Sequence, residues 1–331
     1  MKKGLGRFEF WLRKVEILLL QSATEKNPGL WLYANDLRTP LFMLEGLAKM
    51  HAGMHNGNRF SKMKEDFKLL EDALGTIDYY DSFGKEFLTK PNIPEAITEY
   101  IQAQTREKIQ RLNDLLQQRS WVGENADRIK KIGKKLKDAD WMKEEDEVNA
   151  IAGFYKYSID EINSFIGGLN YKFTEIETQV HALRRKLRWL SIYPKALQGT
   201  IQLTDHAVKD DNLAKYLTED ILNSPFIKMP DAGDNRYFLM LEKNYFLSLS
   251  SIISTLGKLK DSGLRVIAVT EAIQQIRGIG RPEALATAYQ VLGEPQPNIT
   301  SILSQSSATC ETYFKEKNLE KLVSGVSTIQ A

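Results

Sequence analysis

The chain has 331 residues, 42% of them hydrophobic, so it is long enough for one large domain or two and can bury a sizeable core. Its 45 lysines and arginines against 43 aspartates and glutamates leave a net charge of +2, which argues against a protein that coats nucleic acid, although charge can still segregate onto one face. The single cysteine, Cys310, excludes an intramolecular disulfide and a structural zinc site made of several cysteines. A reducing, cytoplasmic compartment is therefore expected.

The N-terminal segment, residues 1–20, carries an apolar stretch behind two lysines, as a signal peptide does. Charges at Glu9, Arg13 and Lys14 interrupt that stretch, and no small-residue cleavage site follows it. We therefore expect an amphipathic first helix. Because a membrane-spanning helix needs about 18 or more apolar residues in a row, which this sequence does not have, no membrane partner is expected.

Apolar residues recur at helical spacing through most of the chain, as in segments 67–77, 101–116 and 183–197. The dipeptide Asn56-Gly57 has no alternating strand pattern beside it, and 21 glycines and 10 prolines are too few for a turn-dense β fold. The sequence therefore predicts an all-α protein. Breaks between helices are expected at turn-forming segments, which lie at residues 27–29, 55–58, 90–94, 224–234 and 294–297.

A highly charged segment, residues 124–148, lies near the middle of the chain. Its lysines and glutamates are typical of a solvated helix face, the interpretation we favour, and a linker between two halves is the alternative. We expect a first helical bundle over residues 1–140, a second over residues 141–317 and a flexible tail over residues 318–331.

Two short signatures occur in the same order in both halves of the chain, which indicates an internal repeat. The first reads Asn/His-x-Leu-Arg-x-x-Leu-x-x-Leu and occurs at residues 35–44 and 181–190, an offset of 146. The second is a Leu-Gly pair on an amphipathic segment, at Leu74-Gly75 and again at Leu256-Gly257. We interpret the chain as a duplicated helical unit with a longer insertion in the second copy.

These residues resemble the CHAD family, the conserved-histidine α-helical domains, and residues 180–190 carry the best match. The resemblance covers most of the chain, residues 5–310. It implies two similar antiparallel helical bundles related by pseudo-twofold symmetry, with histidines and basic residues along a cleft between them. It also implies that the cleft binds inorganic polyphosphate.

The first half departs from this pattern at three places. Asn35 stands where the first-half histidine would be, and Asp78-Tyr79 takes the place of the expected Arg-Asp after the first Leu-Gly pair. Pro40 lies inside the segment that should be helical, where it lacks a backbone donor and is expected to kink the helix. The share of the first half in an anion site is therefore in question.

The candidate binding site is a group of basic residues on the second signature. Residues three and four apart share a helix face, so one polar stripe holds His181, Arg184, Arg185 and Arg188. Cations along two turns repel one another unless an anion lies nearby, and arginine forks bind phosphate oxygens bidentately, while histidine adds a donor whose charge depends on pH. The alternative is a surface helix whose arginines pair with acids of a neighbouring helix or stay solvated. The expected polyanion-binding residues are His181, Arg184, Arg185, Arg188, Arg38, Lys49, Lys258 and Lys260, with Arg265 as a further candidate.

His51 and His55 are four residues apart, so both rings lie on one side of a helix, a spacing that can ligate a metal. No glutamate lies between them, as the metalloprotease pattern requires. We expect an auxiliary phosphate contact there, and neither a metal nor a cofactor is predicted.

The leading hypothesis is a non-enzymatic cytoplasmic protein, associated with polyphosphate granules, that binds inorganic polyphosphate or a similar polyanion. Nucleic acid is not an expected partner at this net charge. The alternative is an all-helical scaffold that binds another protein and has lost the polyanion site. An enzyme acting on phosphorylated small molecules would need carboxylates beside the basic groove, and only Asp78, Asp81 and Asp261 have suitable repeat positions.

Overall fold

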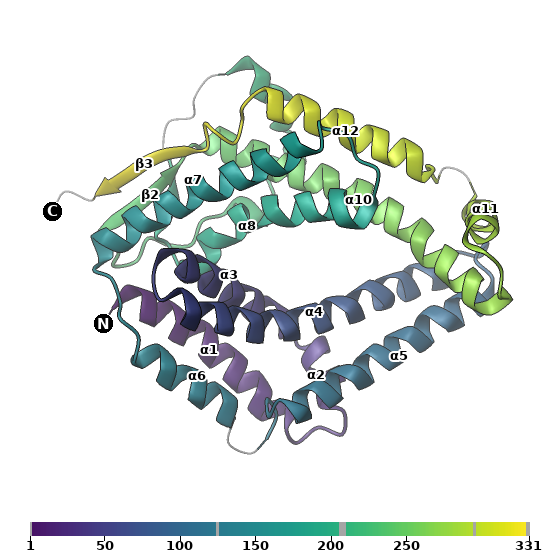
Figure 1. Ribbon diagram of the computed structural model, residues 1–331, viewed down its shortest axis with the longest axis horizontal. Coiled ribbons are helices and arrows are strands. Elements are labelled where there is room, and N and C mark those ends of the chain that lie inside the picture. Colours follow the sequence, from purple (N-terminus) through teal and green to yellow (C-terminus); the bar gives the residue numbers. More distant parts are fainter. Residues whose placement is uncertain (1, 124–125, 205–209, 294–295, 329–331) are drawn as a thin grey trace.

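The computed structural model describes residues 2–123, 126–204, 210–293 and 296–328, and helices dominate it (Figure 1). The all-α prediction is confirmed. The expected break at residues 294–297 lies partly outside the described residues. The helices of the first half are α1 (Lys3–Ser22), α2 (Pro28–Ala34), α3 (Arg38–Met54), α4 (Gly57–Leu88), α5 (Glu95–Gln118) and α6 (Asp127–Lys137).

The second half of the chain begins after α6. The described part of the charged segment 124–148 consists of α6, a short connection and the start of α7 (Glu144–Gly168). A π-helical segment, η1, runs directly into α8. The main helices are α7 (Glu144–Gly168), η1 (Ile176–His181), α8 (Ala182–Ala196), α10 (Lys243–Arg277), α11 (Arg281–Leu292) and α12 (Ile299–Lys315). Shorter segments are η2 (Asp211–Tyr216), α9 (Glu219–Leu222) and η3 (Pro225–Ile227).

The two longest helices, α4 and α10, owe their length to apolar residues that keep one face for many turns. In α4 the buried side chains of Phe60, Phe67, Leu70 and Leu74 recur every three to seven residues. In α10 the same pattern continues to Gly278, which ends the helix with a φ of 65°, a conformation that glycine adopts without strain. These long helices give the molecule its long axis (Figure 1).

Two helix pairs form the centre of the molecule. Helix α3 packs against α4 and also against α8, while α8 packs against α7 and α10. The α3–α4 pair therefore faces the α8–α10 pair, with α1 and α6 outside the first pair and α12 outside the second (Figure 1).

Two hydrophobic clusters among the described residues draw on both halves of the chain. The larger cluster joins Phe8 and Leu44 of the first half to Leu187 of the second. The smaller joins Ile101 to Val269. The two expected bundles therefore share their cores, and the boundary near residue 140, like the pseudo-twofold axis, remains a prediction.

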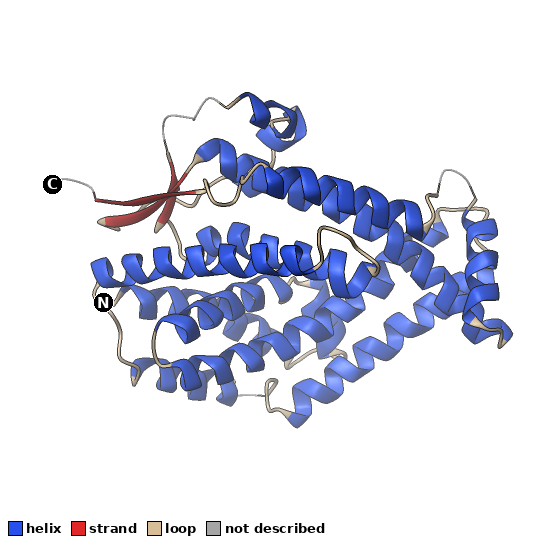
Figure 2. Ribbon diagram, turned by 45° about the horizontal axis from the view of Figure 1, so that its top comes forward, coloured by secondary structure: helices blue, strands red, loops and turns tan. Residues whose placement is uncertain are grey.

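Three short strands that the sequence analysis did not predict form a sheet at one end of the bundle (Figure 2). Strands β1 (Ile201–Leu203) and β2 (Tyr237–Leu241) are parallel, and β3 (Val323–Thr328) is antiparallel to β2. The strands are short, and β2 is a continuous apolar run. The sequence therefore lacks the alternation of apolar and polar residues that would have predicted them. Most of the described part of the expected flexible tail, residues 323–328, is thus a paired strand.

Helix α3 begins at Arg38, three residues after the start of the first signature, and the expected kink at Pro40 is therefore absent. Pro40 lies in the first turn, where a backbone N–H has no partner within the helix, so proline costs no hydrogen bond there. Asp36 precedes the helix and its carboxylate accepts hydrogen bonds from the Thr39 backbone N–H, 3.3 Å away, and from its hydroxyl, 2.9 Å away.

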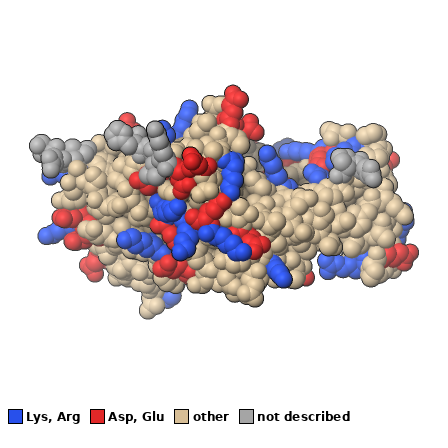
Figure 3. Space-filling view, turned by 90° about the horizontal axis from the view of Figure 1, so that it is seen from above, with Lys and Arg blue, Asp and Glu red and all other residues tan. Residues whose placement is uncertain are grey.

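Charges of both signs are interspersed on the surface that Figure 3 shows. Many charged side chains of the described residues form ion pairs, such as Lys315 with Glu311 at 2.6 Å and Lys321 with Asp210 at 3.3 Å. Among the described residues, no helix combines the length and the apolar composition needed to cross a membrane.

Candidate functional site

A cleft of about 1000 Å³ opens between the α3–α4 pair and the α8–α10 pair. It collects six of the eight expected binding residues from three helices and η1, and Arg265 in addition. The charged residues and the histidine along it are Arg38, Glu71, Asp72, Asp78, Glu86, Glu177, His181, Arg184, Arg185, Arg188, Lys260, Asp261 and Arg265.

Two expected residues, Lys49 and Lys258, lie outside the cleft. Lys49 shares a helix face with Arg38 but is three turns farther along α3, where its ammonium lies 5.4 Å from the centre of the Trp189 ring. Lys258 is two residues from Lys260, so it projects from another side of α10 and is exposed. Helical spacing predicts on which side of a helix a residue lies, but it does not predict which turns of that helix border the cleft.

The α8 wall carries two arginines without acidic partners. Within the described residues, neither Arg184 nor Arg188 forms an ion pair. The Nε of Arg184 donates to the backbone carbonyl of Ile253 at 3.2 Å, and the guanidinium of Arg188 lies 4.9 Å from the centre of the Phe42 ring. Burial lowers the pKa of both groups, and Arg184 and Arg38 lower the pKa of Arg188 further, as expected where cations gather without an anion.

His181 reaches the same wall from the last residue of η1. Burial, and then the nearby charges of Lys260 and Arg185, lower its pKa to about 4. The ring is therefore neutral near pH 7 in this structure. It offers one donor and one acceptor there, without the positive charge that would help to bind an anion.

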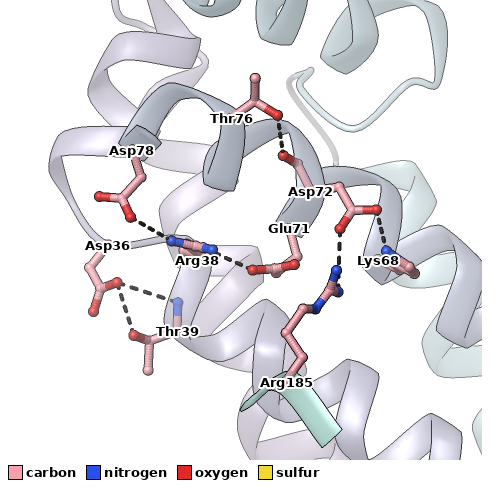
Figure 4. A network of polar contacts seen from close by, with 9 residues as sticks. All are labelled: Asp36, Arg38, Thr39, Lys68, Glu71, Asp72, Thr76, Asp78 and Arg185. Atoms are coloured by element: carbon pink, nitrogen blue, oxygen red, sulfur yellow. Dashed lines mark hydrogen bonds and ion pairs between the residues drawn. The ribbon is translucent and has the colours of Figure 1, made fainter. Parts of the chain in front are cut away.

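The α4 wall, by contrast, is acidic, and it pairs with arginines of the cleft (Figure 4). The Nε of Arg38 lies 2.9 Å from Glu71, which is buried, and its Nη1 lies 2.8 Å from Asp78. Arg185 reaches across from α8 to Asp72, with 3.8 Å between Nη2 and Oδ1. Of the α8 arginines, Arg185 thus fits the sequence-based alternative, in which arginines of that helix pair with acids of a neighbouring helix, whereas Arg184 and Arg188 form no ion pair within the described residues.

Further pairs neutralise the far end of the cleft. The Nε of Arg265 lies 2.6 Å from Glu86, and Lys260 lies 2.6 Å from its neighbour Asp261. Among the described lining residues, six lysines and arginines face six carboxylates. The cleft as a whole is therefore close to neutral, and its unpaired cations are concentrated on α8.

Glu71, Asp72 and Glu86 of α4 were not among the predicted site residues, although the sequence contains a signal for them. Glu71 and Asp78 are seven residues apart, and Asp72 and Glu86 fourteen apart, so each pair returns to nearly the same side of a helix. A helical projection of residues 57–88 would have shown the acidic face. It would not have shown that this face lies opposite α8.

The two Leu-Gly signatures have the same structural role in both halves. A Cβ added to Gly75 would lie 2.8 Å from Nη2 of Arg38, and one added to Gly257 would lie 3.1 Å from Nε of Arg184. Each glycine therefore makes room for the arginine of its own Leu-Arg signature. This shared contact explains why the two signatures occur together in each half.

The same offset of 146 residues relates Phe42 to Arg188, and these two side chains contact each other across the α3–α8 interface. An aromatic ring thus occupies the first-half position where the second half has a cation. Asn35, the counterpart of His181, bonds to the carbonyl of Trp31 at 2.9 Å and does not line the cleft. The first-half signature therefore supplies Arg38 and the ring of Phe42 to the cleft, and Arg38 is its one cation there among the described residues.

The remaining candidate residues lie elsewhere. Asp81 accepts a hydrogen bond from Tyr33 at 2.7 Å and pairs with Lys85. His51 is buried outside the cleft, with its Nδ1 2.9 Å from Nε2 of His55, so the expected phosphate contact is wrong for this residue. Burial, His55 and Arg7 together keep the pKa of His51 well below its ordinary value.

Comparisons of the chain with protein-family models, with curated proteins and with solved structures gave no significant match. The resemblance to the CHAD family rests on the residues of the two signatures.

Proposed function

We propose that this protein binds inorganic polyphosphate or a similar polyanion in the cleft between the α3–α4 and α8–α10 pairs, without catalysing a reaction. One observation carries the proposal. Arg184 and Arg188, both largely buried, line an open cleft and have no acidic partner in the described structure. Two unpaired, partly desolvated guanidinium groups on one wall favour an anion with several oxygens.

Neighbouring groups on the same wall fit a phosphate chain that runs along α8. Neutral His181 can donate a hydrogen bond, and Arg185 is held only by a contact of 3.8 Å to Asp72. Because Asp72 is about half exposed, with 47% of its side chain accessible, it can turn towards solvent when a phosphate takes its place. A ligand bound here extends past α8 towards Lys260.

The acidic α4 wall limits this function. A polyanion that fills the whole cleft meets Glu71, Asp72 and Asp78, so binding there requires that phosphates replace carboxylates on Arg38 and Arg185. We therefore expect moderate affinity that falls with salt, since each contact is screened and counterions are released, as in binding to nucleic acid.

The test is a calorimetric titration with medium-chain polyphosphate at low and at high salt. Replacing both unpaired arginines, Arg184→Gln with Arg188→Gln, removes two charge-assisted contacts and should weaken binding by about a hundredfold or more. The matched control is Arg277→Gln with Arg281→Gln, which removes two exposed arginines outside the cleft and should leave affinity nearly unchanged.

Equal affinity in the two double variants would sink the assignment of the site. No binding by the wild-type protein at low salt would sink the proposed function itself. The near-neutral cleft would then favour the alternative, an all-helical scaffold that binds another protein.

A further inference from the structure

Helix α1 exposes large apolar side chains on the face that points away from the core. Phe10, Ile17 and Leu20 are 46%, 47% and 39% exposed, and Arg13 and Lys14 are exposed between them. The spacing i, i+3, i+4, i+7 and i+10 places all five on one side of the helix. The amphipathic helix expected from the sequence thus has a second, outer face on which apolar and basic residues are mixed.

A cavity of about 690 Å³ opens along this outer face. Its charged lining residues are Lys3, Arg7, Arg13 and Lys14 with the carboxylates Glu9 and Asp234, and Asp234 pairs with Lys3. The Lys14 ammonium lies 4.4 Å from the centre of the Phe10 ring, and within the described residues neither Arg13 nor Lys14 forms an ion pair. The cavity can therefore receive an anionic group next to exposed apolar surface.

Helix α6 packs against α1 and adds further cations (Figure 1). Its apolar residues, such as Ile132 and Leu136, are buried, and its lysines are exposed. None of these lysines has an acidic side chain within ion-pair distance in the part of the chain that the structure describes. The exposed lysines of α6 are Lys130, Lys131, Lys134, Lys135 and Lys137.

We propose that the outer surface of α1 and α6, defined by these lysines and by the exposed residues of α1, docks onto a membrane whose surface carries anionic lipids. Exposed apolar side chains beside cations suit the boundary between acyl chains and headgroups. Unpaired lysines are attracted to the negative surface potential of such a membrane. This inference differs from the sequence-based expectation of no membrane partner, and it does not depend on the cleft.

The mixture of residues favours a lipid surface over the other partners of a basic face. Nucleic acid would leave Phe10 and Ile17 without a role, because the phosphate backbone offers them no apolar surface. Most cations of the cleft pair with carboxylates, whereas Arg13, Lys14 and the exposed lysines of α6 form no ion pair within the described residues. An anionic surface therefore gains more here than at the cleft. A protein partner would need an acidic and apolar surface of matching shape.

The experiment is co-sedimentation of the intact protein with phosphatidylcholine vesicles, with and without phosphatidylserine, at low and at high salt. We expect binding that requires phosphatidylserine and falls with salt. Each lysine near an anionic membrane raises the affinity about fivefold. The triple variant Lys130→Gln, Lys134→Gln, Lys137→Gln should therefore bind the vesicles about a hundredfold more weakly. The double variant Phe10→Ser, Ile17→Ser should also bind more weakly, with most of its loss persisting at high salt.

Matched controls remove the same groups elsewhere. Lys26, Lys156 and Lys172 are exposed but dispersed, so replacing all three by glutamine should have little effect. Leu222→Ser with Phe226→Ser removes two apolar residues that are exposed on another part of the surface. Circular dichroism of each variant confirms that it folds.

Equal binding to vesicles with and without phosphatidylserine would overturn the proposal, as would a lysine variant that binds like its control. Binding of duplex DNA, lost in the lysine variant while vesicles do not bind, would instead assign the surface to nucleic acid and also overturn it. The cleft variant with Arg184→Gln and Arg188→Gln should bind vesicles normally, which separates this proposal from the proposed function.

Discussion

Glu45 is a buried carboxyl group of α3 whose ionised form is unfavourable in the folded protein. The side chain is 4% exposed, and burial, followed by repulsion from Glu71, raises its pKa to about 7 from an ordinary value of 4.5. The folded protein therefore holds a proton there that the unfolded chain releases above about pH 4.5. The associated stability is present at low pH and is lost as the pH rises towards 7.

Replacing this carboxyl group by an amide, Glu45→Gln, should remove the free-energy cost of ionising a buried group. We expect the variant to have a free energy of unfolding about 2 kcal/mol or more higher than the wild type at pH 8, and less than about 1 kcal/mol higher at pH 5. Urea unfolding at the two pH values measures both differences. A variant that is no more stable at pH 8 would show that the carboxylate has a favourable partner when it ionises.

His181 should link polyanion binding to protons. Its pKa is about 4 because of burial and the charges of Lys260 and Arg185, and Asp261 only partly offsets them. A phosphate bound beside the ring favours the charged form and raises this pKa towards its ordinary value. The bound protein then takes up a proton between these pKa values, so affinity rises as the pH falls from 7 to 5, by about fivefold or more.

The control is His181→Asn, which places the residue of the first-half signature at this position. Calorimetric titrations at pH 7 and pH 5 should show a smaller gain in affinity for this variant than for the wild type. Titrations in two buffers of different ionisation enthalpy should show that the variant takes up fewer protons on binding. An identical pH dependence in both proteins would mean that carboxylates of the cleft, and not His181, take up the protons.

At the scale of helices, each Leu-Gly signature sets the position of an arginine. A methyl group on Gly257 would lie 3.1 Å from Nε of Arg184, so this side chain must shift by a few tenths of an ångström. Alanine is the better helix former by about 1 kcal/mol, which offsets the crowding. We expect Gly257→Ala to leave the melting temperature nearly unchanged and to weaken polyphosphate binding about fivefold.

Gly153 in α7 is the matched control, because a Cβ there meets nothing within 4 Å. Gly153→Ala should raise the free energy of unfolding by about 0.5–1 kcal/mol and leave binding unchanged. Thermal melts and titrations of both variants make the comparison. Wild-type affinity in Gly257→Ala would show that the position of Arg184 does not matter for the ligand.

The helices and their order were open to prediction because the apolar spacing is local. The Leu-Arg and Leu-Gly signatures likewise led to Arg184 and Gly257, since each pattern sits on one helix. The pairing of Arg38 with Glu71 and Asp78 was not predictable, because it depends on how α3 packs against α4. Strand β3 was missed since its partner β2 is some eighty residues away in the chain and neither strand alternates clearly.

At the scale of the whole molecule, the cleft lies between two groups of helices whose cores are continuous. Ile101 of α5 and Val269 of α10 belong to one hydrophobic cluster, and the other cluster also crosses from the first half to the second. A cleft made in this way keeps its width only while both halves are folded. A ligand that spans it should therefore stabilise the protein as a unit.

The shared cores predict that the two halves unfold together. Val269 is fully buried, so Val269→Ala should lower the free energy of unfolding by about 2–3 kcal/mol through lost apolar contact and the cavity that remains. Because its cluster includes residues of α4 and α5, this loss should appear in the first half as well. Native-state hydrogen exchange measures it, as an equal fall in protection of the slowest amides in α3 and in α8. A fall confined to α8 would show that the first bundle folds by itself, and the cleft would then be the interface between two independent domains.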